Sequence, residues 1–197
     1  MKEIKAMLKG TTKVVTGKVR LSYANIFEPK SINGSEPKYS VSLIIPKDDK
    51  QQIEVIKQAI KNAIEEGKSK LADKNGNIPK NIKLPLRDGD EDRPEDEAYA
   101  NSYFLNANSV RPPQVVGTEI DKATGKAIPL GENDVYSGCY ARVSLNFYAF
   151  NTNGNKGIAC GLGNIQKVED GERLGGGASA EEDFDFEEVD AEDDFLF

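Results

Sequence analysis

One strand-like segment carries the side chains with the clearest chemistry. Residues 138–150, GCYARVSLNFYAF, alternate between small or aliphatic side chains and a second set that includes Tyr140, Arg142, Tyr148 and Phe150. A period of two is typical of a β-strand with one face in a core. Aromatic rings stack on any unpaired base, and a guanidinium binds phosphate. The outward face therefore predicts binding of single-stranded DNA without sequence preference. The alternative is that the rings pack beneath a helix or a long connection, because tyrosine and phenylalanine are usually core residues.

Basic and aromatic residues on other predicted strands could extend this surface. A groove that tracks a DNA backbone needs positive charge along its length. Taken singly, basic residues on a strand face are also common as ordinary solvated surface. The full set of predicted DNA-binding residues is Lys18, Arg20, Lys38, Phe104, Arg111, Tyr140, Arg142, Tyr148 and Phe150.

The C-terminal segment combines acidic residues with large aromatic ones. Residues 178–197 hold ten acidic side chains and no basic one, and the sequence ends DDFLF. A tail that served solubility alone would gain nothing from exposed aromatic rings, which favour aggregation. We therefore expect a flexible tail, residues 171–197, that docks onto partner proteins. The predicted contact residues are Phe184, Phe186, Asp193, Asp194, Phe195, Leu196 and Phe197.

Charge separates this tail from the rest of the chain. The net charge is −7, yet the first 177 residues hold 26 basic and 23 acidic side chains. A second acidic cluster, residues 88–97, holds seven acids and one arginine, and without it the body carries about +9. A basic body joined to an acidic tail suggests a polyanionic ligand that the tail can mimic.

Several classes of enzyme and site are excluded by what the sequence lacks. There is no histidine, so neither a Ser-His-Asp triad nor a histidine-ligated zinc can form. Cys139 and Cys160 are too far apart for a CxxC motif and lie in apolar runs, which predicts reduced core residues. Asp88, Asp90 and Asp92 match the first ligand spacings of an EF-hand loop, but Arg93 replaces the required glycine. We expect no metal and no cofactor.

The remaining patterns predict a mainly β protein. Strands are expected over 14–24, 38–45, 102–109, 138–150 and 157–168, and a helix over 48–71. In the first strand Val19, Leu21 and Tyr23 share the inward face. Residues 73–97 are rich in Asn, Gly, Pro and Asp, so little regular structure is expected there. The fold expected is an OB-fold-like, five-stranded Greek-key barrel with an inserted helix, residues 1–170.

Four segments resemble a known family. They are YSVSLIIPK (39–47), RPPQVV (111–116), YSGCYARVSLNFYAF (136–150) and KGIACGLGNIQKVEDGE (156–172). They are similar to the phage-encoded single-stranded DNA-binding proteins of the OB-fold type. The resemblance implies a non-enzymatic protein that protects single strands in phage DNA replication or recombination. The tail is similar in kind to the acidic tips of bacterial and phage single-strand binders, although its DDFLF end departs from the usual bacterial sequence.

The partners expected are therefore single-stranded DNA and replication or recombination proteins, and a homo-oligomer is left open. No apolar run of about 18 residues and no export signal occurs, so we expect no membrane contact and a location in the cytoplasm of the host cell. Two other functions fit parts of the sequence. A carboxylate-dependent metal nuclease would use residues 88–97, and a virion or scaffold protein would use the tail for assembly.

Overall fold

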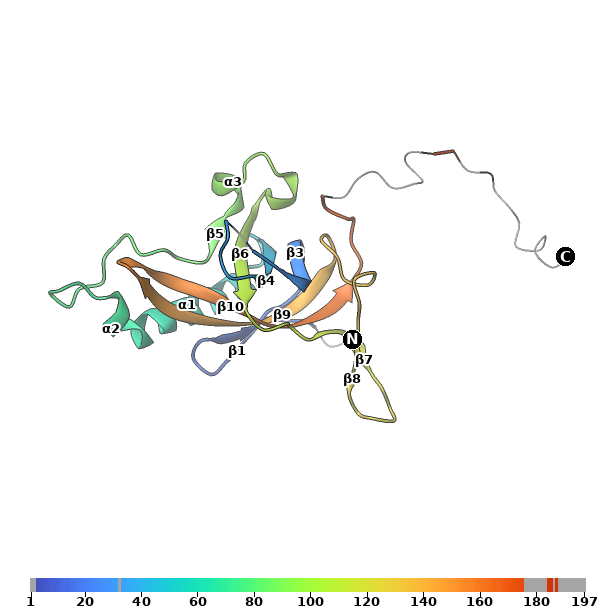
Figure 1. Ribbon diagram of the computed structural model, residues 1–197, viewed down its shortest axis with the longest axis horizontal. Helices are drawn as coiled ribbons and strands as arrows, with labels where there is room; N and C mark the ends of the chain where they lie inside the picture. Colours follow the sequence, from blue (N-terminus) through green and yellow to red (C-terminus); the bar gives the residue numbers. More distant parts are fainter. Residues whose placement is uncertain (1–2, 32, 176–183, 186, 188–197) are drawn as a thin grey trace, which may run out of the picture.

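The computed structural model describes residues 3–31, 33–175, 184, 185 and 187. The described chain is mainly β, as predicted (Figure 1). Its strands are β1 (Met7–Lys9), β2 (Lys13–Val15), β3 (Val19–Lys30), β4 (Lys38–Pro46), β5 (Arg87–Asp88), β6 (Ser102–Ser109), β7 (Val115–Ile120), β8 (Ala127–Pro129), β9 (Tyr140–Thr152) and β10 (Asn155–Glu169). The helices are α1 (Lys50–Glu66), α2 (Lys68–Leu71), α3 (Gly89–Asp92) and the short 3-10 helix η1 (Glu97–Tyr99).

Five of these strands close into a barrel. β3 pairs with β4, β4 with β6, β6 with β10, β10 with β9, and β9 again with β3. All of these pairs are antiparallel except β6 and β10, which run parallel. This ring is the arrangement of an OB-fold, and it removes the open sheet edges that invite aggregation. β7 and β8 form a hairpin that extends from β10 away from the barrel (Figure 1).

The barrel interior is built by the inward residues of these strands, as their period of two requires. In β9 the inward residues Ala141, Val143, Leu145, Phe147 and Ala149 are all buried. The two cysteines are free and buried, which confirms their assignment to the core.

Helix α1 packs its apolar stripe against this core. Ile53, Ile56 and Ile60 are buried among the barrel residues. The helix begins after Asp49, whose side chain accepts a hydrogen bond from the Gln52 backbone N–H. The expected single helix is divided at Gly67, where a Cβ atom would lie 2.1 Å from the Cβ of Ala149.

The strand expected over 14–24 is in fact two strands, β2 and β3. The chain bends between them, where the buried hydroxyl of Thr16 accepts a hydrogen bond from the Val143 N–H at 2.9 Å. The Gly17 N–H donates to the side-chain oxygen of Gln52 at 2.7 Å, so α1 holds the bend. Side-chain acceptors on Thr16 and Gln52 therefore supplement the backbone hydrogen bond from the Thr16 N–H to the Val143 carbonyl at this point.

Residues 87–101, called the strap below, have more regular structure than expected. They contain β5, α3 and η1 and lie over the outer face of the barrel at β6 (Figure 1). Tyr99 is fully buried with Ile44 and Phe104 in a small second core. The prediction of an irregular connection is wrong here because a few apolar residues in a polar segment were enough to anchor it.

Candidate nucleic-acid interface

A polar groove lies on the outer face of β3, β4 and β6, beside the strap. Ser40 pairs in register with Asn108 and Ser42 with Asn106, so hydroxyl and amide groups line its floor. The groove has a volume of about 590 Å³. The residues around it are Tyr23, Asn25, Lys30, Ser35, Glu36, Lys38, Ser40, Val41, Ser42, Arg93, Asn106, Ala107 and Asn108. Three of these side chains are basic and one is acidic, which suits a polyanion.

Tyr23 supplies the aromatic surface of the groove. Its φ of 46° is unusual for a residue that is not glycine, and the β3–β4 register shifts between Ser22 and Asn25. This irregularity turns the ring outward, so that 56% of Tyr23 is exposed. The expectation that Tyr23 faces the core with Val19 and Leu21 is therefore wrong. A strained residue at a cleft is a recognised mark of function.

Arg93 reaches the same groove from the strap. Its guanidinium carbon lies 5.0 Å from the ring centre of Tyr23, 5.0 Å from that of Tyr99 and 5.2 Å from that of Phe104. Attraction between a cation and aromatic faces holds the guanidinium in this position. In the sequence, Arg93 stands out only as the lone base of an acidic cluster and as the residue that replaces the glycine of an EF-hand loop. No local pattern indicates that three rings surround it.

A buried Phe104 corrects one predicted DNA contact. The ring has no exposed surface and meets Tyr99 edge-on, with their centres 5.1 Å apart. Residue 104 does lie on the outer face of β6, but the strap covers that part of the face. The Phe104 ring thus packs against the Arg93 guanidinium and is not accessible to DNA.

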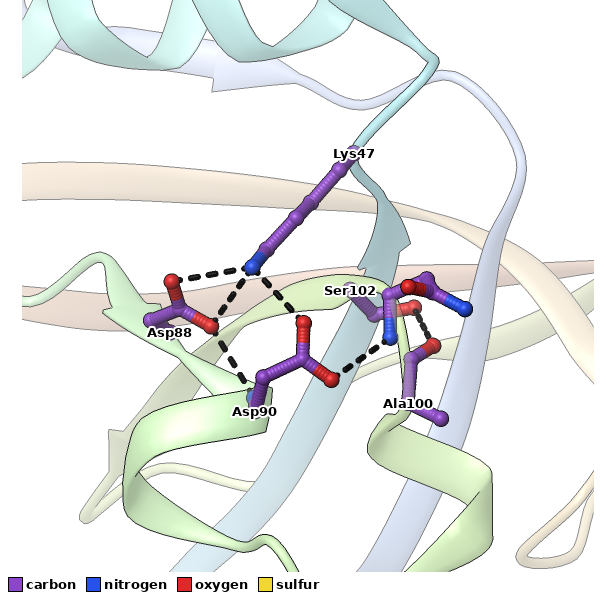
Figure 2. A network of polar contacts seen from close by, with 6 residues as sticks. Lys47, Asp88, Asp90, Ala100 and Ser102 are labelled. Atoms are coloured by element: carbon purple, nitrogen blue, oxygen red, sulfur yellow. Dashed lines mark hydrogen bonds and ion pairs between the residues drawn. The ribbon is translucent and has the colours of Figure 1, made fainter.

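A charged clamp ties the strap to the end of β4. Figure 2 shows Lys47 Nζ between two carboxylates, 2.8 Å from Asp88 Oδ1 and 2.8 Å from Asp90 Oδ2. Asp90 also accepts a hydrogen bond of 2.9 Å from the backbone N–H of Asn101. Hydrogen bonds from Lys47 lower the pKa of Asp88 and of Asp90, and those carboxylates raise the pKa of Lys47. The clamp fixes both ends of the strap.

The structure places one of the predicted basic residues, Lys38, in the groove. Three others have protein partners elsewhere. Lys18 pairs with Glu169 at 3.0 Å. Arg20 donates to the carbonyls of Gly138 and Glu172, and Arg142 donates to those of Thr16 and Lys5. In this structure these arginines hold the N-terminal and C-terminal segments on the barrel.

The outward face of β9 lies on another side of the barrel. In the ring of strands β9 is separated from β4 by β3 and from β6 by β10. On this face Tyr140 is half-buried between Lys18 and Arg20, and Phe150 is half-buried, while Tyr148 is 47% exposed. The remaining predicted residue, Arg111, is exposed just after β6. The aromatic residues of β9 do alternate with buried ones, as predicted, but they do not line the groove.

The first residues of the expected tail, 171–175, lie on the barrel close to the groove. Leu174 donates its backbone N–H to the Ser137 carbonyl at 2.9 Å. A neighbouring cavity of about 390 Å³ is lined by Leu174 and Gly175 and also by Tyr23 and Lys30. Of the predicted tail contacts, Phe184 is exposed. The others, Phe186, Asp193, Asp194, Phe195, Leu196 and Phe197, lie outside the described residues.

The acidic residues that a metal-dependent nuclease would use, residues 88–97, belong to the strap. Among residues 3–31, 33–175, 184, 185 and 187, no group of three or more acidic or cysteine side chains could hold a metal ion. Asp88 and Asp90 face Lys47 instead. In the same part of the chain no helix is both long and apolar enough to cross a membrane.

The fold matches solved structures of phage proteins. The single-stranded DNA-binding protein from bacteriophage Enc34, solved with single-stranded DNA, aligns at a TM-score of 0.67 and 24% identity, over 89% of this chain and 100% of that one. Its C-terminal truncation gives 0.68 and 25%, over 88% and 95%. The single-stranded DNA-binding protein gp2.5 of bacteriophage T7 gives 0.57 and 16%, over 84% and 90%.

Sequence comparison agrees with the structural likeness. The putative protein p50 of Acyrthosiphon pisum secondary endosymbiont phage 1 is 33% identical over 178 residues, which cover 88% of this chain and 92% of the relative. The family model described as the single-stranded DNA-binding protein of Enterobacter phage Enc34 matches residues 12–196. The chain therefore belongs to the family of Enc34-type phage single-stranded DNA-binding proteins.

Proposed function

We propose that this protein binds single-stranded DNA without sequence preference in the groove on β3, β4 and β6, during phage DNA replication or recombination. The observation that carries the proposal is the convergence of an exposed aromatic ring, Tyr23, with Lys30, Lys38 and Arg93 around one groove. β4 and β6 are the second and third strands of the barrel, the face on which OB-folds bind oligonucleotides. Family membership supports a DNA-binding protein rather than an enzyme.

The chemistry of the groove explains the lack of sequence preference. Tyr23 can stack on any base, and each base stacked in this way contributes about 1 to 3 kcal/mol. Lys30 and Lys38 can neutralise phosphates, which carry no sequence information. Stacking needs unpaired bases, so single strands should bind more tightly than duplex.

Fluorescence anisotropy with labelled oligo-dT tests this proposal. Tyr23→Ala should weaken binding by about 1 to 3 kcal/mol. Tyr148→Ala removes a tyrosine of similar exposure from β9 and serves as the matched control. If Tyr148→Ala weakened binding and Tyr23→Ala did not, the DNA path would lie on β9 as the sequence alone suggested.

The acidic tail gives the protein a second proposed role. Its carboxylates can reach the groove and compete with DNA, and its aromatic residues can dock onto replication or recombination proteins. The support is the position of Gly175, which shares a cavity with Tyr23 and Lys30. A chain that leaves the barrel there needs few residues to reach the groove, so its effective concentration is high.

A further inference from the structure

Among the described residues, the guanidinium of Arg93 has no ion-pair partner. Within the described part of the chain its Nε atom is buried and has no hydrogen-bond partner. Two nearby acids are paired with other residues, since Asp92 pairs with Arg87 at 2.8 Å and Asp90 with Lys47. A buried N–H donor without a hydrogen-bond partner is unfavourable. An anion that enters the groove would remove this penalty.

The side chain of Arg93 forms part of a wall between two cavities of opposite charge. On one side is the groove, lined by Lys30, Lys38 and a single acid, Glu36. On the other side is a cavity that Tyr23 and Arg93 share with four acids, Asp92, Glu95, Asp96 and Glu97. A DNA strand is attracted to the first side and repelled from the second.

We propose that Arg93 binds a backbone phosphate of the DNA strand, and that the pair Tyr23–Arg93 marks the strap-side end of the DNA path. This inference rests on the proposed function, because it places one contact within the groove described above. Tyr23 stacks on the last base of the bound strand, and Arg93 binds the phosphate next to that base. The four acids beyond the pair keep the strand from continuing across the strap.

Lys47 is then a positioning residue for this contact. It binds Asp88 and Asp90, which flank the start of α3, and the Arg93 N–H closes the same turn by donating to Gly89 O at 2.9 Å. Lys47 does not line the groove. Its effect on DNA must therefore pass through the orientation of the strap.

The test compares two arginines on the same strap. Arg93→Gln removes the proposed contact, and Arg87→Gln removes an equal charge whose guanidinium also lies over Phe104, at 5.3 Å, but does not line the groove. Oligo-dT binding is measured over a range of salt concentrations. Arg93→Gln should lower affinity about tenfold and reduce the salt slope by about 0.7, the value for one phosphate contact on a single strand. Arg87→Gln should leave the slope unchanged.

Three further variants separate a direct contact from loss of folding. Arg93→Lys keeps the charge and should restore the salt slope. Lys47→Met should weaken binding, and the double variant Lys47→Met with Arg93→Gln should bind no more weakly than Arg93→Gln alone. Equal salt slopes for Arg93→Gln and Arg87→Gln would overturn the inference while leaving the groove intact. If the unaltered protein did not bind oligo-dT at all, the proposed function itself would fail.

Discussion

Arg20 Nη2 donates a hydrogen bond of 2.8 Å to the carbonyl oxygen of Glu172, and Arg20 Nε donates one of 3.0 Å to Gly138 O. A residue predicted to bind DNA thus fastens the C-terminal segment to the barrel. Arg20→Ala should lower the free energy of unfolding by about 1 to 2 kcal/mol, because two charge-assisted hydrogen bonds are lost. Urea denaturation measures this change.

Lys18→Ala is the control for that variant, since it removes an exposed ion pair with Glu169 that contributes little to stability. Affinity for oligo-dT should stay near that of the intact protein in both variants. If Arg20→Ala greatly lowered the affinity for oligo-dT without changing stability, Arg20 would be a DNA contact after all.

The division between α1 and α2 should depend on the absence of a side chain at Gly67. A Cβ atom there would meet the Cβ of Ala149 at 2.1 Å, and neither backbone can retreat without disturbing the core. Gly67→Ala should destabilise the fold by about 1 to 3 kcal/mol. Thermal melts measure this loss of stability. Gly131→Ala, at a position with open space around it, should leave the melting temperature almost unchanged.

The clamp on the strap should be sensitive to acid. The pKa values of Asp88 and Asp90 are lowered in the folded protein, so their contribution is present above the ordinary value of 3.8 and is lost as the pH falls through the lowered values. The pKa of Lys47 is raised, so its contribution is fully present below the ordinary value of 10.5 and is lost as the pH rises through the raised value. The clamp is therefore complete between these limits.

Thermal melts between pH 3 and 7 test this account of the clamp. The intact protein should lose stability at the acid end of this range. Lys47→Met should show a smaller change of stability with pH, because the carboxylates of Asp88 and Asp90 then have no lysine partner in the folded protein. Identical pH profiles for the two proteins would mean that the clamp contributes nothing to stability.

Removal of residues 178–197 should tighten binding to single strands, most at low salt where attraction between tail and groove is least screened. It should also abolish recruitment of a replication or recombination partner. Phe197→Ala keeps every acidic side chain, so it should bind DNA as the intact chain does and still lose partner affinity. Titrations of oligo-dT at two salt concentrations measure the first effect. Unchanged DNA affinity after tail removal at low salt would end the competition hypothesis.

The sequence predicted the elements of the barrel better than the location of its binding face. The alternation in residues 138–150 identified the inward side of β9 correctly, because a buried strand face demands apolar residues at every second position. The same rule misplaced Tyr23, because the irregularity in β3 reverses the alternation after Ser22. A register shift of this kind leaves no mark in hydrophobic periodicity.

Arg93 and Phe104 were misjudged for a related reason. The strap covers the outer face of β4 and β6 at Ile44 and Phe104, and this contact joins residues far apart in the sequence. Phe104 is buried by it, and Arg93 is carried to the groove by it. Local patterns cannot report which of two outward residues a distant segment will cover.

The central claim is that single-stranded DNA lies in the groove beside the strap, and photo-crosslinking tests it most directly. Oligo-dT containing 5-iodouracil is bound to the full chain and irradiated, and the crosslinked residue is identified by mass spectrometry. This chemistry favours aromatic side chains in contact with a base. We expect a crosslink to Tyr23, which Tyr23→Ala abolishes. A crosslink to Tyr140, Tyr148 or Phe150 in place of Tyr23 would contradict it and would put the DNA on β9.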